Sequence, residues 1–156
     1  MSIIFDDVTF EYIARVRLHD DETSIVLRGH LLVEYLLNKI IESKCKNSNT
    51  ILKDSRSYTF LVKLQLVYSM GLIPECVWKN AAKINKIRNE LAHNLDFDEK
   101  KIDMILYNSE GEPIVVNVKG KRYPIRFYLK LLAFDTLTQL RNHMMFNLRL
   151  LQIRRS

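Results

Sequence analysis

Apolar residues recur at intervals of three and four along most of the chain, and this spacing predicts α-helices. The longest such run spans residues 22–44. Its apolar face consists of Ile25, Leu32, Leu36 and Ile40. We expect Asp20 or Asp21 to cap this helix, because a carboxylate accepts hydrogen bonds from the free N–H groups of a first turn.

The same periodicity predicts further helices over residues 10–17, 57–70, about 74–93 and 126–150, with a loop at 45–50. Gly71 is a suitable residue to end the helix over 57–70, and Pro74 suits the first turn of the next one. The last helix is apolar on more than one side, through both its leucines and its phenylalanines. Such a helix lies at the centre of a bundle or in a subunit interface.

Two segments before the last helix differ in pattern. We expect a short helix that begins at Asp96, Asp98 or Glu99 and ends near Tyr107. Residues 114–118 are rich in β-branched side chains and predict a strand, which turns at 119–122 toward a partner at 123–125. The expected fold is therefore all-α, an up-and-down helical bundle with a small β-hairpin insertion before the last helix, in one domain over residues 1–156.

The segment Arg88-Asn89-Glu90-Leu91-Ala92-His93 ends the amphipathic helix with a fixed cation and a titratable imidazole. Arg88 falls within the apolar stripe of that helix, where a solvated arginine is not expected, and Asn89 and His93 share a polar face with Lys86. An arginine can hold a phosphate bidentately, and a histidine can transfer a proton near neutral pH. Together they indicate phosphodiester chemistry.

Arg88 and His93 are five positions apart, so their side chains diverge by about 140° around the helix. Either the long arginine reaches round the helix, or a second copy of the chain supplies the missing half of the site. A symmetric homodimer would do the latter.

Arg88, Asn89 and His93 match the Arg-Asn-x-x-x-His signature of the HEPN superfamily, helical-bundle proteins of which many are metal-independent endoribonucleases. Residues 28–37, 68–73 and 84–97 resemble the mannitol operon repressor branch, whose bundle carries the same Arg-Asn-x-x-Ala-His segment. The resemblance covers about residues 22–106. It does not extend to the strand-like segment near 114–125.

The resemblance implies an RNA-cleaving site that needs neither a metal nor another cofactor. His93 would act as the general base for the 2′-hydroxyl or as the general acid for the leaving 5′-oxygen. Arg88 would hold the non-bridging oxygens while charge builds, and Asn89 would orient the imidazole or the phosphate. The expected products are a 2′,3′-cyclic phosphate and a 5′-hydroxyl.

Five basic residues are expected to add contacts to the substrate backbone. They are Arg28, Lys86, Lys119, Lys121 and Arg122. The last three lie at the tip of the predicted hairpin, which can hold a backbone without reading its sequence. The alternative is that these charges belong to an ordinary solvated turn.

Each residue of the motif also has a structural interpretation. His93 could be a C-terminal helix residue stabilised by the macrodipole, and Asn89 could be a surface residue. Arg88 could be buried in an ion pair, for which Glu34 is the expected partner. The remaining histidines are expected to be structural: His19, His30 and His143.

Composition adds little to these expectations. Apolar residues make up 47% and charged residues 27% of the 156 positions, as in ordinary globular proteins. The net charge of +6 favours anionic partners, although a generic basic protein remains an alternative. Cys45 and Cys76 have neither metal-ligand spacing nor a disulfide framework, which favours reduced thiols in a cytoplasmic protein. We expect no signal peptide and no membrane span.

A different class of function competes with RNA cleavage. The mannitol repressor resemblance implies a non-catalytic transcriptional regulator or protein-interaction module. No exposed helix carries the side chains of a helix-turn-helix reader, so such a regulator would act through a partner protein. A toxin or phage-defence role would be a biological setting for the ribonuclease, and the sequence does not distinguish these settings.

Overall fold

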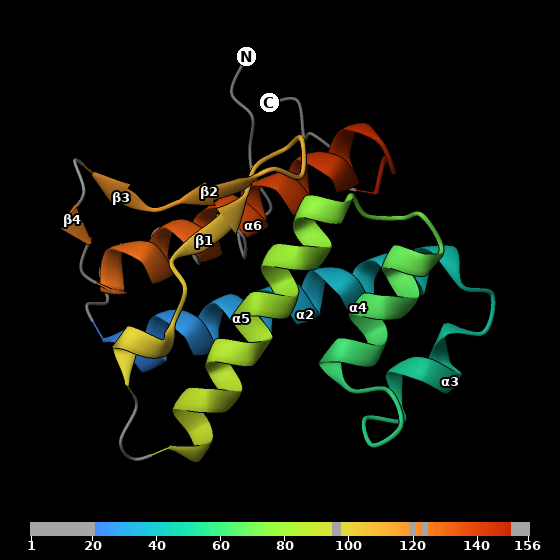
Figure 1. The fold of residues 1–156 in the computed structure, drawn as a ribbon. Helices are drawn as coiled ribbons and strands as arrows, with labels where there is room; N and C mark the ends of the chain where they lie inside the picture. Colours follow the sequence, from blue (N-terminus) through green and yellow to red (C-terminus); the bar gives the residue numbers. More distant parts are fainter. Residues whose placement is uncertain (1–20, 95–97, 119–120, 123–124, 151–156) are drawn as a thin grey trace, which may run out of the picture.

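The computed structural model describes residues 21–94, 98–118, 121–122 and 125–150, so the helix expected over 10–17 lies outside the described residues. The described part is mostly helical, with short antiparallel strands before the last helix, and the predicted fold class is confirmed. The helices are α2 (Glu22–Lys44), α3 (Ser48–Leu52), α4 (Phe60–Ser69), α5 (Glu75–His93) and α6 (Ile125–Phe146). Figure 1 shows the strands beside α5 and α6, on the side of the bundle away from α3.

Helix α2 lies at the centre of the bundle and packs against α3, α4, α5 and α6. Asp21 caps it as predicted, because its Oδ2 accepts a hydrogen bond from the N–H of Ser24 at 2.8 Å. Six of its side chains are fully buried: Ile25, Val33, Leu36, Leu37, Ile40 and Ile41. Adjacent pairs among them point to different sides of the helix, so neighbours must cover α2 on more than one face.

Several helix boundaries differ from the predicted positions. Part of the expected loop over 45–50 is helical in α3, because Ile51 and Leu52 pack against the core. Helix α4 begins at 60 instead of 57, since Thr59 is still extended, and it ends before Gly71 as predicted, where φ is +69°. Helix α6 ends at 146 instead of 150. There the N–H groups of residues 147 and 148 both donate to the carbonyl of His143.

The strands differ from the prediction. Instead of a helix that reaches Tyr107, a 3-10 turn at Glu99–Lys101 is followed by strand β1 (Ile105–Tyr107). Strand β1 pairs antiparallel with β2 (Pro113–Val115), whereas the sequence pattern had assigned a partner at 123–125. A second small pair joins β3 (Asn117–Val118) to β4 (Lys121–Arg122). Residues 119–120 and 123–124 lie outside the described part.

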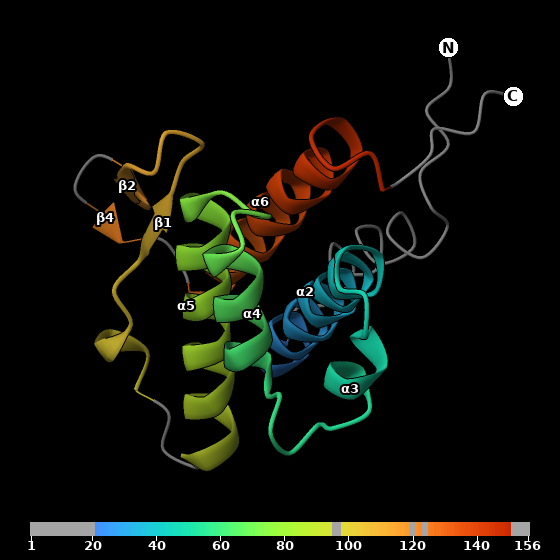
Figure 2. The same cartoon turned by 90° about the vertical axis from the view of Figure 1, so that its right-hand side faces the viewer.

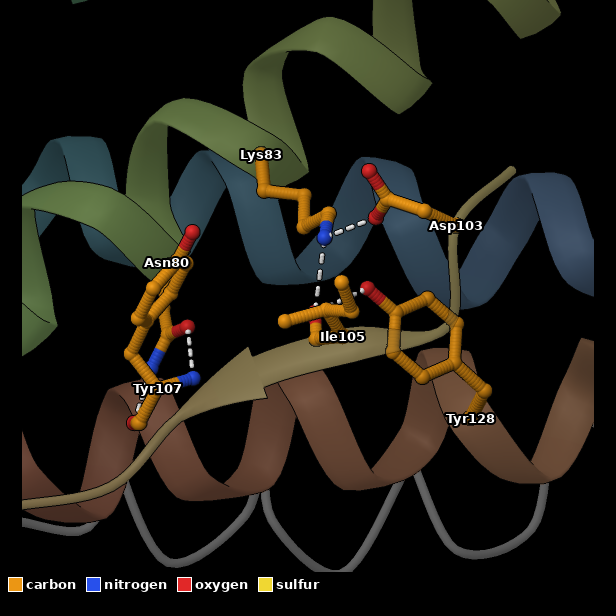
Figure 3. Close-up of polar contacts among 6 residues, drawn as sticks. All are labelled: Asn80, Lys83, Asp103, Ile105, Tyr107 and Tyr128. Atoms are coloured by element: carbon orange, nitrogen blue, oxygen red, sulfur yellow. Dashed lines mark hydrogen bonds and ion pairs between the residues drawn. The ribbon is translucent and has the colours of Figure 1, made fainter. Parts of the chain in front are cut away.

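Side chains from two helices hold β1 in its extended conformation (Figure 3). Asn80 of α5 is fully buried; its Oδ1 accepts from the N–H of Tyr107 and its Nδ2 donates to the carbonyl of the same residue, both at 2.8 Å. The carbonyl of Ile105 accepts from Lys83 Nζ at 2.8 Å and from the Tyr128 hydroxyl at 2.7 Å. These side chains bond to backbone N–H and C=O groups of β1 that would otherwise lack partners, so the segment is extended although its local pattern predicts a helix.

Replacing Asn80 with alanine should therefore lower the free energy of unfolding by about 2–4 kcal/mol, because two backbone groups of Tyr107 lose their partner. Urea denaturation followed by circular dichroism measures this. The control is Asn49→Ala on the exposed surface of α3, which should change stability by less than about 0.5 kcal/mol. Equal effects of the two variants would contradict the role of Asn80.

Candidate functional site

An open cavity of about 470 Å³ lies between α2, α4 and α5. Figure 2 shows α4 and α5 next to each other with α2 beside them. Helices α2 and α5 contribute five polar residues to the cavity wall, His30, Glu34, Asn85, Arg88 and Asn89, and the segment before α4 adds Ser55 and Thr59. The turn before α4 and its first residue add the rings of Tyr58 and Phe60. Residues of α2 and α4, which are distant in sequence from α5, thus line the same cavity as Arg88 and Asn89 of the predicted motif.

Two of the three motif residues lie together on this wall. Arg88 is half-buried, and its Nη1 donates a hydrogen bond to Asn89 Oδ1 at 3.0 Å. His93 is exposed at the last residue of α5 and does not line the cavity. Asn89 is therefore hydrogen-bonded to the arginine and, within the described residues, not to the imidazole. In a single copy of the chain, Arg88 lines the cavity and His93 does not.

The expected ion pair between Arg88 and Glu34 is not formed. Glu34 Oε1 instead lies 3.0 Å from Nζ of Lys63, which comes from α4 and is only 5% exposed. A buried ammonium group requires a paired carboxylate, and α4 brings Lys63 within reach of Glu34. As a result, Arg88 has no acidic partner among the residues that the structure describes, and its charge is available to an anion in the cavity.

Sequence reasoning missed His30 as a residue of the site. Its ring is 7% exposed, stacks on Phe60 at 4.1 Å between centroids, and places Nε2 3.0 Å from Asn85 Oδ1. Burial lowers the pKa of His30, and so does Arg88, while Asn85 and Glu34 act in the opposite direction. His30 lies one turn before Glu34 and Asn85 one turn before Asn89, a spacing that could have indicated both.

The other predicted substrate contacts are not brought to the cavity. Lys86 is exposed on α5 and Arg28 is half-buried on α2, and neither lines the wall. Lys119 lies outside the described residues, and only the backbone of Lys121 and Arg122 is described, in β4. Figures 1 and 2 place β4 and α4 on opposite sides of α5, so the hairpin lies away from this site.

Two other features bear on the sequence predictions. Cys45 and Cys76 are both free thiols, and Sγ of Cys76 donates to Gln139 Oε1 at 2.8 Å. Within the described ranges, none of the helices combines the length and the apolar character needed to cross a membrane.

Comparison of the chain with protein-family models, with curated proteins and with solved structures finds no match.

The pairing of Glu34 with Lys63 can be tested by measuring the free energy of unfolding. Glu34→Gln should destabilise the protein by about 2–3 kcal/mol, because it leaves the ammonium group of Lys63 buried without a counter-charge. Chemical denaturation at neutral pH measures the change. The matched control is Glu42→Gln, which breaks an exposed pair with Lys39 and should cost less than about 1 kcal/mol. A loss no greater than that of the control would show that Lys63 does not depend on Glu34.

Proposed function

We propose that this protein is a metal-independent endoribonuclease and that a second copy of the chain completes its site. The observation that carries the proposal is the state of Arg88, a half-buried cation on a cavity wall with no acidic partner among the described residues. A cation in such a place favours a phosphate ligand, because it can pair bidentately with the phosphate oxygens. The resemblance of Arg88, Asn89 and His93 to the HEPN signature supports the same assignment.

RNA carries its own nucleophile, so the protein needs to supply only proton transfer and charge stabilisation. The 2′-oxygen attacks the adjacent phosphorus, the bond to the 5′-oxygen breaks, and a 2′,3′-cyclic phosphate remains. Arg88 would stabilise the non-bridging oxygens, and His93 would take the proton of the 2′-hydroxyl or return one to the 5′-oxygen. DNA lacks the 2′-hydroxyl and should not be cleaved.

The positions of the two residues favour a composite site. Arg88 lines the cavity, whereas His93 lies exposed at the end of α5, about 140° further round the helix. In a symmetric dimer, the partner's His93 can approach the cavity of the first copy, and the arrangement repeats by symmetry. Exposed phenylalanines on α6, Phe127 and Phe134, provide apolar surface that a second copy could cover.

Single-stranded RNA should be cleaved in the presence of a chelator, and the rate should depend on both motif residues. His93→Ala should reduce cleavage by about 10²–10⁴-fold and Arg88→Ala by about 10²–10³-fold, with folding retained by circular dichroism. Lys44→Ala, at the far end of α2, controls for the loss of one surface cation. Cleavage that persists equally in the motif variants would remove the assignment.

The pH dependence of the same assay, from about pH 5 to 9, separates an enzyme from a binding module. Paired acid and base steps should give a bell-shaped profile. Asn89→Ala should retain part of the activity, because an orienting hydrogen bond contributes less than the proton-transfer group. Cleavage that requires added magnesium would indicate a contaminating nuclease.

A composite site has a specific consequence for mixtures of variants. Light scattering should give a particle of twice the 18.5 kDa chain mass. Mixing the inactive Arg88→Ala and His93→Ala chains should restore cleavage to about a quarter of the wild-type rate. This value follows because half of the dimers are mixed and each mixed dimer holds one intact site. A monomer, or a mixture that stays inactive, would contradict the composite arrangement.

The second candidate function is the non-catalytic regulator or protein-interaction module that the mannitol repressor resemblance implies. One observation favours it, an apolar stripe on the exposed side of α2. Leu27, Leu31 and Tyr35 follow one another at four-residue intervals and are 41%, 55% and 37% exposed. Exposed apolar surface of this kind is typical of a docking site for another protein. The absence of RNA cleavage at every pH would favour this candidate.

A further inference from the structure

The two asparagines on the cavity wall have their carbonyl oxygens occupied by fixed donors. Asn89 Oδ1 accepts from Arg88 Nη1 at 3.0 Å, and Asn85 Oδ1 lies 3.0 Å from His30 Nε2. An arginine can only donate hydrogen bonds, so it determines which way the Asn89 amide is turned. The NH₂ groups of both asparagines make no hydrogen bond to another residue in the described part of the chain.

His30 orients Asn85 in the same way that Arg88 orients Asn89. A carbonyl oxygen only accepts, so the ring nitrogen that faces it must carry the proton, and this nitrogen is Nε2. Nδ1 is buried and has no hydrogen-bond partner among the residues that the structure describes. Burial lowers the pKa of His30, which favours the neutral ring with a single N–H. Of the charged groups nearby, Glu34 on α2 is paired with Lys63 of α4, and Arg88 on α5 opposes protonation of the ring.

We infer that the NH₂ groups of Asn85 and Asn89 and the guanidinium of Arg88 form a donor-only site for an RNA phosphodiester, with His30 as the positioning residue of Asn85. The three side chains of α5 fall within about 100° around the helix, so they can meet one ligand. A phosphodiester group offers only acceptor oxygens, which matches this set of donors. This inference rests on the proposed function only for the identity of the anion, which is the RNA backbone.

Binding is measured with an RNA whose 2′-hydroxyls are methylated, because it cannot be cleaved. Asn85→Asp keeps the shape of the side chain and an acceptor for His30, but it replaces the NH₂ donor with a carboxylate oxygen. Fluorescence anisotropy should show binding weaker by about tenfold or more. Asn142→Asp introduces the same charge at an exposed position of α6 and controls for long-range repulsion. Equal weakening by the two variants would overturn the inference.

Nuclear magnetic resonance tests the orientation directly. The side-chain NH₂ signal of Asn85 should shift saturably as methylated RNA is added, while the signal of Asn142 should not. The ring nitrogens of His30 should show a protonated Nε2 and a bare Nδ1 at pH 7. A proton on Nδ1 alone would mean that Asn85 turns its oxygen toward the cavity, and the inference would be wrong.

The positioning role of His30 is tested by a pair of substitutions. His30→Leu removes the donor to Asn85 and should weaken RNA binding, whereas His30→Gln keeps an N–H donor and should restore most of it. Equal binding by the two variants would overturn the positioning role.

Failure of the proposed function is a separate outcome, since wild-type protein could bind methylated RNA through Asn85 and leave unmodified RNA uncleaved. Such a result would support the anion site and overturn the ribonuclease assignment.

Discussion

The burial of α2 on several faces is the constraint on which the rest of the structure depends. Six of its side chains, at neighbouring as well as helically spaced positions, are fully removed from solvent, so α4, α5 and α6 must all pack against it. This packing places His30 and Glu34 of α2 opposite the polar face of α5. The cavity is thus a consequence of how the core is covered. A change that loosened α2 would disturb the core and the site together.

The pairing of charges in the cavity leaves Arg88 without a carboxylate partner in the described part of the chain. Lys63 is too deeply buried to be solvated, so it takes the carboxylate of Glu34 at 3.0 Å. Arg88 keeps only the hydrogen bond to its neighbour Asn89 among the described residues. The wall that results combines the cation of Arg88 with two amide groups, with the carboxylate of Glu34 that is paired with Lys63, and with the imidazole of His30, whose pKa is lowered by burial. This combination favours an anionic ligand over a neutral one, whatever chemistry follows binding.

Helix α5 performs two tasks on different sides. On one side, Asn80 and Lys83 bond to the backbone of β1 and hold the small strands against the bundle (Figure 3). On the other side, Arg88 and Asn89 face the cavity next to α4. Because both sets of side chains lie on one rigid helix, the hydrogen bonds to β1 also help to fix the position of the cavity wall. His93, at the exposed end of the same helix, lies neither at β1 nor on the cavity wall.

The sequence by itself determined the helical fold class, the span of α2 with its Asp21 cap, the end of α4 at Gly71 and the position of the motif at the end of α5. These features are local, since they depend on periodicity, capping and turn residues within a few positions. Tertiary structure alone decided that residues 105–107 form a strand, that Glu34 pairs with Lys63, and that His30 and Asn85 join the site. Each of these involves a side-chain contact between residues at least 22 positions apart in the chain, which periodicity cannot identify.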